Sequence, residues 1–285
     1  MKSNTKYVKS PMNYTGGKYK LLKQILPLFP QKIDRFVDLF CGGCNVSVNV
    51  PYAGKVIAND YDENVISIYR KFQLMPIDDI LSYIDDRVNE YSLTKENSNG
   101  YIAFRDMYNT SVEKNPLDLY VLICYSFNNQ IRFNSRGEFN MPFGKNRSSF
   151  NTSMRSNLIN FHEAIKDIVF TCKSFDDLKL WKMTSGDFVY CDPPYLITCA
   201  TYNERGRWDE LCERKLIELL DNLNDNGVRF ALSNALSNKG ATNDILSEWC
   251  GKYNVYHLSN SYSNCSYHSS DRGSNTTDEV LITNY

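Results

Sequence analysis

The amino-acid sequence predicts an α/β protein with a parallel central sheet and one inserted segment. Short apolar runs typical of buried strands alternate with amphipathic helical runs in the first and last thirds of the chain. A glycine pair follows the first predicted strand, 35–40, and an acidic residue ends the second, 55–60, as in nucleotide-binding α/β units. Residues 128–153 are instead rich in Asn, Ser, Arg, Gly and Phe, which indicates an inserted element outside the core.

The composition is that of an ordinary soluble globular protein. Lys and Arg number 32 against 33 Asp and Glu in 285 residues, and 42% are hydrophobic, which excludes disordered, collagen-like and fibrous classes. No window approaches the roughly 18 uninterrupted apolar residues of a transmembrane helix, and the N-terminal residues lack the apolar core of a secretory signal. We therefore expect no membrane partner and a cytoplasmic location.

The N-terminal third predicts the opening of the sheet. Residues 19–28 have helical spacing, the strand at 35–40 runs into a glycine pair, and the strand at 55–60 precedes a helix over 63–73. The order of strand, glycine turn, helix and a second strand ending in an acid is expected of a nucleotide-binding unit.

The middle of the chain predicts helices and a hairpin. Residues 76–118 are helical and charged, with a polar break at 94–100, and residues 117–127 form a strongly apolar helix or strand. Arg136 and Gly137 lie between two short Phe-containing runs, so we expect them to form the tip of a hairpin.

The α/β alternation resumes after residue 158. A buried strand within 186–195 ends in a polar loop that two prolines stiffen. The other expected elements are helices over 162–168, 213–227 and 242–253 and strands over 228–234, 253–258 and 278–285.

The nine cysteines do not predict a disulfide scaffold, because their number is odd and most lie in apolar or strand-like runs. We expect free, mostly buried thiols. Cys41 and Cys44 form a single Cys-x-x-Cys pair, but a structural zinc site needs a second pair of ligands. The three histidines, His162, His257 and His268, are scattered, so we expect no metal.

The first motif that can carry chemistry is the turn from Asp38 to Gly43, together with Asp60. Glycines in this turn let the backbone approach a ligand closely, and an acid ending the second strand can bind ribose hydroxyls. The pattern is not Gly-x-Gly-x-x-Gly, which disfavours a dinucleotide. A plain tight turn is the alternative.

The second motif is Asp192-Pro193-Pro194-Tyr195, directly after a buried strand. The prolines remove two backbone donors, which leaves a carboxylate, bare carbonyls and an aromatic face in a fixed array. Such an array suits an exocyclic amine on a ring, because the oxygens accept its protons while Tyr195 stacks on the ring. A proline turn with a structural aspartate is the alternative.

Glycines and basic residues gather near the N-terminus and in the inserted segment. Residues 13–18, Asn-Tyr-Thr-Gly-Gly-Lys, lack the phosphate-loop pattern, but Tyr14 offers a stacking surface and Lys18 a charge. Residues 131–155 hold five basic side chains against the single Glu138. Such a patch attracts phosphates, and a solvated loop is the alternative.

Taken in order, the motifs at 13–18, 36–43 and 186–195 and the C-terminal run 279–285 resemble those of the Dam-type (D12 class, α group) DNA adenine-N6 methyltransferases of phages, bacteria and restriction-modification systems. The segment 126–144 resembles the recognition hairpin of that family. The resemblance covers nearly the whole chain. It implies a Rossmann-like class I methyltransferase sheet with an inserted, mainly helical target-recognition domain that carries a β-hairpin.

The resemblance also implies a division of the chain and a set of partners. Two parts of a catalytic domain, 1–75 and 159–285, flank a target-recognition domain at 76–158. S-adenosylmethionine is the expected cofactor, without a metal, and duplex DNA is the expected substrate. The family allows for a cognate restriction endonuclease that acts on the same site. We expect a monomer in the cytoplasm of a bacterial or phage-infected cell.

Single residues take their expected roles from the same resemblance. Asp192, Pro193 and Tyr195 are expected to handle the target base. The expected cofactor-binding residues are Tyr14, Gly17, Lys18, Asp38, Phe40, Gly42, Asp60, Phe175, Asp176 and Asp192. The expected DNA-binding residues are Phe127, Asn128, Arg132, Asn134, Arg136, Pro142, Lys145 and Arg147. Asn146 stands where some relatives carry Arg, so the target sequence stays open.

Other functions fit parts of the same pattern. Cytosine-N4 methylation also acts on an exocyclic amine of a base, although enzymes of that kind more often have Ser at the position of Asp192. Protein or RNA N-methyltransferases usually show Asn-Pro-Pro, and an NAD-type oxidoreductase would carry the glycine fingerprint. From a different class, a catalytically inactive, sequence-specific DNA-binding protein is the alternative, and a cofactor-binding titration separates it from an enzyme.

Overall fold

The structure is a computed structural model that describes residues 7–51, 53–198, 208–259 and 277–285. The chain divides into two compact units. The first unit comprises Met1–Tyr19, Gly42–Asn49 and Asp62–Cys172, and the second unit comprises Lys20–Cys41, Val50–Tyr61 and Lys173–Tyr285.

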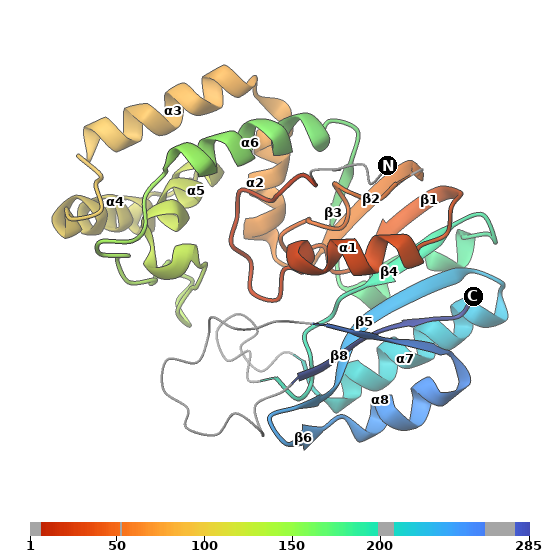
Figure 1. The fold of residues 1–285 in the computed structure, drawn as a ribbon. Helices are drawn as coiled ribbons and strands as arrows, with labels where there is room; N and C mark the ends of the chain where they lie inside the picture. Colours follow the sequence, from red (N-terminus) through yellow and green to blue (C-terminus); the bar gives the residue numbers. More distant parts are fainter. Residues whose placement is uncertain (1–6, 52, 199–207, 260–276) are drawn as a thin grey trace. The chain divides into compact units, whose positions relative to one another are not determined.

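The second unit is built on a central sheet with helices, which confirms the predicted α/β class (Figure 1). Its strands are β1 (Ile33–Asp38), β2 (Ala53–Asp60), β4 (Phe188–Cys191), β5 (Arg229–Asn238), β6 (Ala241–Thr242), β7 (Asn254–Leu258) and β8 (Thr277–Thr283). Its α-helices are α1 (Leu22–Ile25), α7 (Glu210–Asp225) and α8 (Asp244–Trp249). The strand order is β2-β1-β4-β5-β8-β7, and β6 pairs with β5. Strands β2, β1, β4 and β5 run parallel, whereas β8 is antiparallel to β5 and to β7.

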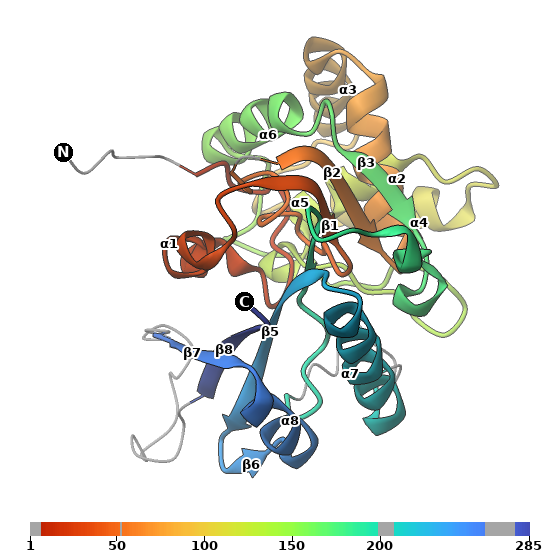
Figure 2. The same cartoon turned by 90° about the vertical axis from the view of Figure 1, so that its right-hand side faces the viewer.

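Side chains alternate between the two faces of this sheet, as expected of strands that are covered on both sides. Val37 and Val189 belong to a buried cluster that also contains apolar residues of α7 and α8. On the opposite face, Phe188 meets Phe29 edge to face, with 4.8 Å between ring centres. Figure 1 and Figure 2 show α7 and α8 side by side along β5. The faces of the sheet therefore form the core, and the strand ends are left to carry a site.

Helix α7 shows how local sequence sets an element. The Asp209 side chain accepts a hydrogen bond from the backbone N–H of Cys212 at 2.9 Å and caps the first turn. Leu216 and Leu220 recur at helical spacing on the buried face. Gly227, with φ of +69°, turns the chain toward β5. The cap, rather than the first apolar residue, marks the start of the helix.

The first unit is mainly helical. Its elements are α2 (Glu63–Leu74), α3 (Ile77–Glu90), α4 (Ser98–Thr110), α5 (Pro116–Tyr125), α6 (Thr152–Ala164) and the strand β3 (Val169–Cys172). Helix α5 lies at the centre, because α2, α3 and α4 all pack against it and Leu117–Tyr125 are buried throughout (Figure 1). The apolar run 117–127 is therefore mostly a helix, which starts at the Asn115 cap with Pro116 in the first turn.

The predicted helix between the first two strands is wrong. The described residues between β1 and β2, 41–51, form turns. Cys44 has φ of +59°, a conformation that an α-helix excludes. The β-branched valines and Pro51 of this segment also disfavour a helix.

Several helix boundaries also differ from the prediction. The helix predicted over 242–253 is α8 (Asp244–Trp249) followed by a 3₁₀ turn at Cys250–Lys252. The polar break 94–100 is shorter than predicted, because Asn97 caps α4 by accepting a hydrogen bond from Gly100 N at 3.1 Å. The run 19–28 contains the single turn α1 between 3₁₀ turns, since Pro27 cannot continue an α-helix. The helix predicted from residue 162 is the C-terminal end of α6, which starts at its own asparagine cap.

The described part of the chain contains no helix long and apolar enough to cross a membrane. Its seven cysteines are free thiols, while Cys199, Cys265 and His268 lie outside the described residues. No group of three His, Cys, Asp or Glu side chains that could hold a metal occurs within the described ranges.

Candidate active site and nucleic-acid interface

Three acidic side chains lie at the carboxyl ends of neighbouring parallel strands in the second unit. Strand β2 ends at Asp60, β1 ends at Asp38, and Asp192 directly follows β4. The strand register pairs Asp38 with Ala58 on one side and with Tyr190 on the other. Ligands of α/β sheets bind at this carboxyl edge. The structure therefore brings the three predicted acids to one edge of the sheet.

Asn59, whose role was not predicted, connects the loops at this edge of the sheet. Its Nδ2 donates hydrogen bonds to Leu39 O and to Lys173 O, both at 3.0 Å. Its own carbonyl accepts a hydrogen bond from Cys41 N at 2.7 Å. Asn59 is buried, so it holds the turn after β1 against the segment that leads to Phe175. The feature of the sequence that points to this role is an amide side chain inside an apolar strand.

Phe40 and Phe175, both predicted to bind the cofactor, lie together with Trp208. The ring centres are 5.5 Å apart for Phe40 and Phe175, and Trp208 is 5.6 Å from each of them. Trp208 Nε1 donates to the buried Glu213 carboxylate at 2.7 Å. The three rings form an apolar wall. Trp208 and Glu213 were not predicted, because nothing in the local sequence links them to the first strand.

Asp176 stands beside Phe175 in the short 3₁₀ turn Phe175–Asp177. The Ser174 hydroxyl donates a hydrogen bond to its carboxylate, and Lys215 Nζ lies 3.7 Å from it. The bond from Ser174, assisted by the charge of Lys215, lowers the pKa of Asp176. This carboxylate is therefore ionised at neutral pH and can accept hydrogen bonds from a ligand.

The loop after β4 is anchored through the phenol of Tyr195. The hydroxyl lies 3.1 Å from Glu279 Oε1 and 3.4 Å from Asp192 Oδ1. Burial, followed by these two carboxylates, raises the pKa of Tyr195 well above its usual value, so the phenol keeps its proton. Glu279 was not predicted, and the available signal was a charged residue at the start of the apolar run Val280–Ile282.

In the first unit, the two glycine turns lie against each other. Gly17 N donates to Tyr14 O at 3.1 Å, and Lys18 Nζ donates to the Gly16 carbonyl at 2.8 Å. Gly42 has φ of +44°, and a Cβ at this position would lie 2.9 Å from the Tyr14 ring. The structure therefore brings Tyr14, Gly17 and Gly42 together, and residue 42 has no room for a side chain.

Residues 126–144 form the predicted two-armed antiparallel loop, which we call the recognition loop. Its arms are joined by a bridge between Phe133 and Phe139 and by a hydrogen bond from Phe127 N to Pro142 O at 2.7 Å. The pairing is limited to isolated bridges, so the loop is a hairpin without a continuous ladder.

The tip of the recognition loop is held by Asn134. Its Oδ1 accepts hydrogen bonds from the backbone of Arg136 at 2.9 Å and of Glu138 at 3.0 Å, and its Nδ2 donates to the Glu138 carboxylate at 2.7 Å. The bond from Asn134, assisted by the ion pair with Arg136, lowers the pKa of Glu138. Gly137 has φ of +78°, which confirms the predicted tip. The DNA contacts of Asn134 and Arg136 stay predictions.

Arg132 links the two arms of the recognition loop. Its Nε and Nη2 donate to the side-chain and backbone oxygens of Asn140 at 2.9 and 2.8 Å. The Asn140 N–H returns a hydrogen bond to Arg132 O at 3.0 Å. The guanidinium thus stabilises the loop, and its predicted contact with a base stays a prediction.

Phe127, Asn128 and Arg147 form an exposed patch, which we call the stacking patch. The Arg147 guanidinium lies 5.0 Å from the centre of the Phe127 ring and donates to Asn128 Oδ1 at 3.1 Å. Asn13 Nδ2 fixes Asn128 through its carbonyl at 2.8 Å. An arginine on an exposed aromatic ring offers both charge and a stacking surface to nucleic acid. Lys145 is exposed as well.

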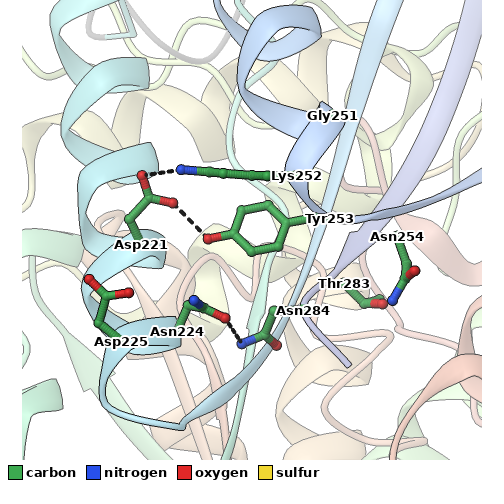
Figure 3. Close-up of a pocket in the computed structure, with 9 residues that line it drawn as sticks. All are labelled: Asp221, Asn224, Asp225, Gly251, Lys252, Tyr253, Asn254, Thr283 and Asn284. Atoms are coloured by element: carbon green, nitrogen blue, oxygen red, sulfur yellow. Dashed lines mark hydrogen bonds and ion pairs between the residues drawn. The ribbon is translucent and has the colours of Figure 1, made fainter.

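A separate groove of about 510 Å³ lies near the amino ends of the parallel strands of the second unit (Figure 3). Figure 3 shows Lys252 and Tyr253 directed at Asp221, which accepts their hydrogen bonds at 2.8 and 2.7 Å. Burial opposes ionisation of Asp221, but these bonds outweigh it and lower its pKa. The groove contains none of the predicted site residues, and its bonded carboxylate joins α7 to the turn after α8.

One class of protein, the DNA adenine-N6 methyltransferases, is expected to combine these features: acids at the carboxyl edge of the sheet, glycine turns and an Asp-Pro-Pro-Tyr loop. The chain belongs to the D12 class N6 adenine-specific DNA methyltransferases, whose family model matches residues 14–264. This membership confirms the resemblance that the sequence motifs indicate.

Individual relatives refine this placement. The chain is 50% identical over 98% of its length to the type II methyltransferase M.FokI of Planomicrobium okeanokoites, and 47% identical over 99% of its length to the modification methylase StsI of Streptococcus sanguinis. It spans only 43% and 44% of those two proteins. It is also 30% identical to a DNA adenine methylase of Serratia marcescens over 71% of each chain.

Proposed function

We propose that this chain transfers a methyl group from S-adenosylmethionine to N6 of an adenine in duplex DNA. The observation that carries the proposal is the Asp192–Tyr195 loop at the carboxyl edge of the sheet, in a chain of the N6-adenine family. The central sheet is then the Rossmann-like sheet of class I methyltransferases, and residues 1–75 and 159–285 form the catalytic domain. Family membership favours adenine N6 over cytosine N4.

The carboxyl edge of the second unit fits S-adenosylmethionine. The wall of Phe40, Phe175 and Trp208 suits a purine ring. The carboxylate of Asp60 suits ribose hydroxyls, and that of Asp38 suits the cationic amino group of the methionine moiety. When bound, the cofactor supplies a methyl group already activated on a positively charged sulfur.

The remaining predicted cofactor residues are assigned to the same ligand. Asp176 would accept a hydrogen bond at the adenine end, because its carboxylate is ionised. In the first unit, the absence of a side chain at Gly42 would let the backbone approach the cofactor closely. We assign Tyr14, Gly17 and Lys18 to the cofactor with it, and we assign no role to a metal.

The Asp192–Tyr195 loop would overcome the weak nucleophilicity of adenine N6, whose lone pair is delocalised into the ring. The Asp192 carboxylate and the Pro193 carbonyl accept hydrogen bonds from the two N6 protons. This geometry directs the nitrogen lone pair out of the ring plane, toward the methyl carbon. The bound cofactor would supply the methyl group and keep the electron pair of the carbon–sulfur bond, and the Asp192 carboxylate would accept one N6 proton.

An adenine inside a duplex must leave the base stack before it can reach this loop. The Tyr195 ring would stack on the extruded base, and aromatic stacking of this kind contributes roughly 1–3 kcal/mol. The phenol is fixed through Glu279, so the ring is oriented before the base arrives.

The recognition domain, which we place at 76–158, would select the target sequence. The stacking patch and Lys145 would bind the DNA backbone and unpaired bases, while the recognition loop would enter the major groove. There Arg132 would exchange Asn140 for a guanine edge, the commonest specific contact of an arginine. Asn134, Arg136 and Pro142 are assigned to the same interface.

The relatives suggest the setting of this activity. M.FokI is named a type II methyltransferase and StsI a modification methylase. We propose that this chain likewise protects DNA in the cytoplasm of a bacterial or phage-infected cell, beside a restriction endonuclease that acts on the same site. We propose that it acts as a monomer.

Nucleoside analysis tests the proposed reaction. The purified chain is incubated with duplex DNA and isotopically labelled S-adenosylmethionine, and the DNA is digested and analysed by mass spectrometry. We expect label in N6-methyldeoxyadenosine and none with Asp192→Ala, whereas the exposed Asp225→Ala should behave as wild type. Label in N4-methyldeoxycytidine would contradict the proposal. Binding of DNA with neither cofactor binding nor methyl transfer would indicate a catalytically inactive DNA-binding protein.

A further inference from the structure

Glu279 is a buried carboxylate at the start of an apolar strand segment. It is 2% exposed, and Val280 to Ile282 after it are fully buried. Val280 and Ile282 face the cluster of α7 and α8, so strand alternation places Glu279 on the opposite face. Burying a carboxylate is unfavourable unless hydrogen bonds compensate. A plain core role for this position would therefore be met better by an apolar residue.

Strand β5 carries small side chains on the face that it shares with Glu279. Strand β5 lies between β4 and β8, so about two strand spacings, roughly 10 Å, separate the end of β4 from β8. The residues of β5 that share a face with Glu279 are Ala231, Ser233 and Ala235.

The strand next to Glu279 is irregular at this point. The register between β5 and β8 shifts after Ala235, which pairs with Glu279, and leaves Leu236 as the extra residue of a β-bulge. Bulges redirect side chains and occur often beside active sites. Just beyond the bulge, Asn238 Nδ2 donates to Ile197 O at 3.3 Å. Strands β5 and β8 thus hold the Asp192–Tyr195 loop at two points.

The phenol of Tyr195 has one proton and two carboxylates within reach. The contact with Glu279 is 3.1 Å and the contact with Asp192 is 3.4 Å. A hydroxyl donates a single hydrogen bond, so the two carboxylates compete for it. The shorter contact is the one to Glu279.

We propose that Glu279 is a positioning residue that takes the hydrogen bond of the Tyr195 phenol and thereby keeps the phenol from occupying the Asp192 oxygen to which the target amine would bind. This inference rests on the proposed function and adds a residue to it. Without Glu279 the phenol turns to Asp192 and competes with an N6 proton for the same oxygen. Removal of Glu279 would then slow the chemical step and leave the affinity for the cofactor unchanged.

A pair of substitutions separates this role from simple packing. Glu279→Met keeps the length of the side chain and removes the acceptor, and we expect kcat to fall about tenfold, the effect of one misplaced hydrogen bond. Tyr195→Phe removes the competing proton but keeps the ring, and we expect a loss of about threefold. Adding Tyr195→Phe to Glu279→Met should restore kcat to the level of Tyr195→Phe alone.

Glu279→Gln serves as the conservative variant, because its amide oxygen can still accept the phenol proton. Its kcat should stay within about threefold of wild type, and Tyr195→Phe should not raise it. This variant carries the test if Glu279→Met does not fold. The matched surface control is Glu248→Met, at an exposed position of α8. Melting temperature and cofactor affinity are measured for every variant.

Two results would overturn the inference. The first is a Glu279→Met, Tyr195→Phe double variant whose loss in kcat is the product of the two single losses, as expected if both side chains only pack. The other is a Glu279→Gln enzyme that folds, binds cofactor and loses tenfold or more in kcat, by the same scale of one hydrogen bond. Failure of the proposed function is distinct from both, because wild-type protein would then form no N6-methyladenine.

Discussion

The loop after β4 and the recognition loop are both polar and both predicted to be functional, yet they are held in different ways. Tyr195 and Ile197 are fastened to β8 and β5, which are distant in sequence and buried. The tip of the recognition loop is held by its own side chains, through Asn134 and Arg132. The loop to which we assign the chemical step is thus fixed to strands of the central sheet, whereas the tip of the loop to which we assign DNA reading is held by side chains of the loop itself.

The base of the recognition loop qualifies this comparison. Asn109 of α4 exchanges two hydrogen bonds with the backbone of Phe139, at 2.9 and 3.0 Å. Tyr101 of the same helix donates to Met141 O at 2.9 Å. Helix α4 therefore anchors the arm of the recognition loop that contains Phe139 and Met141.

The largest expected effect is the loss of the reaction in Asp192→Ala. The change removes the carboxylate that we propose orients the amine and accepts its proton, so we expect the rate of methyl transfer to fall at least about a hundredfold. Cofactor binding should be partly retained. Single-turnover methylation and a cofactor titration measure the two effects. Turnover close to that of wild type would remove Asp192 from the mechanism.

The next largest effect is a change of sequence preference in Arg132→Ala. Loss of a bidentate contact with guanine should reduce discrimination at one position by about 1–3 kcal/mol. Lys145→Ala should instead weaken binding to all sequences alike and lower the salt slope by about 1. Competition binding with target and non-target duplexes over a range of salt measures both.

Asn140→Ala is the matched control for Arg132, because it removes the side-chain oxygen that accepts the hydrogen bond of Arg132 Nε and keeps the guanidinium. Sequence preference should survive in Asn140→Ala if Arg132 reads a base. Equal loss of preference in the two variants would mean that Arg132 acts by shaping the loop, and the distinction between the two regions would weaken.

The smallest expected effect concerns stability at the amino end of the parallel strands. Asp187 accepts a hydrogen bond from Arg35 Nη2 at 2.6 Å and another from Thr184 N at 2.8 Å. Burial alone would raise its pKa, but these bonds lower the pKa of Asp187 below its usual value. The stabilisation is present above the unfolded pKa of about 4 and is lost as the pH falls through the folded value.

Asp187→Asn should therefore lower the free energy of unfolding by about 1–3 kcal/mol at neutral pH. Its stability should also fall less steeply in acid than that of wild type, while kcat is unchanged. Urea denaturation between neutral pH and pH of about 3, a range that spans the carboxyl titration, measures this difference. If Asp187→Asn loses stability in acid as steeply as wild type does, the Arg35–Asp187 pair is not the source of the pH dependence.

The sequence could predict what local patterns encode. The spacing of apolar residues predicts strand β2 and helix α2 nearly to the residue. The Asp192-Pro193-Pro194-Tyr195 motif likewise predicts the loop that it forms. Glu279, Trp208 and Asn59 were missed because each acts through a partner that only the fold brings near. Tyr195 and Glu279, for example, lie 84 residues apart in the chain. Caps such as Asn97 and Asp209 were missed because they precede the apolar residues that mark a helix.

Long-read sequencing of DNA from cells that express this chain tests the central claim most directly. We expect N6-methyladenine at one recurring sequence in cells with the wild-type chain, and unmodified DNA in cells with Asp192→Ala. N4-methylcytosine at that sequence would contradict the account. Unmodified DNA in cells whose folded wild-type chain binds S-adenosylmethionine would contradict it equally.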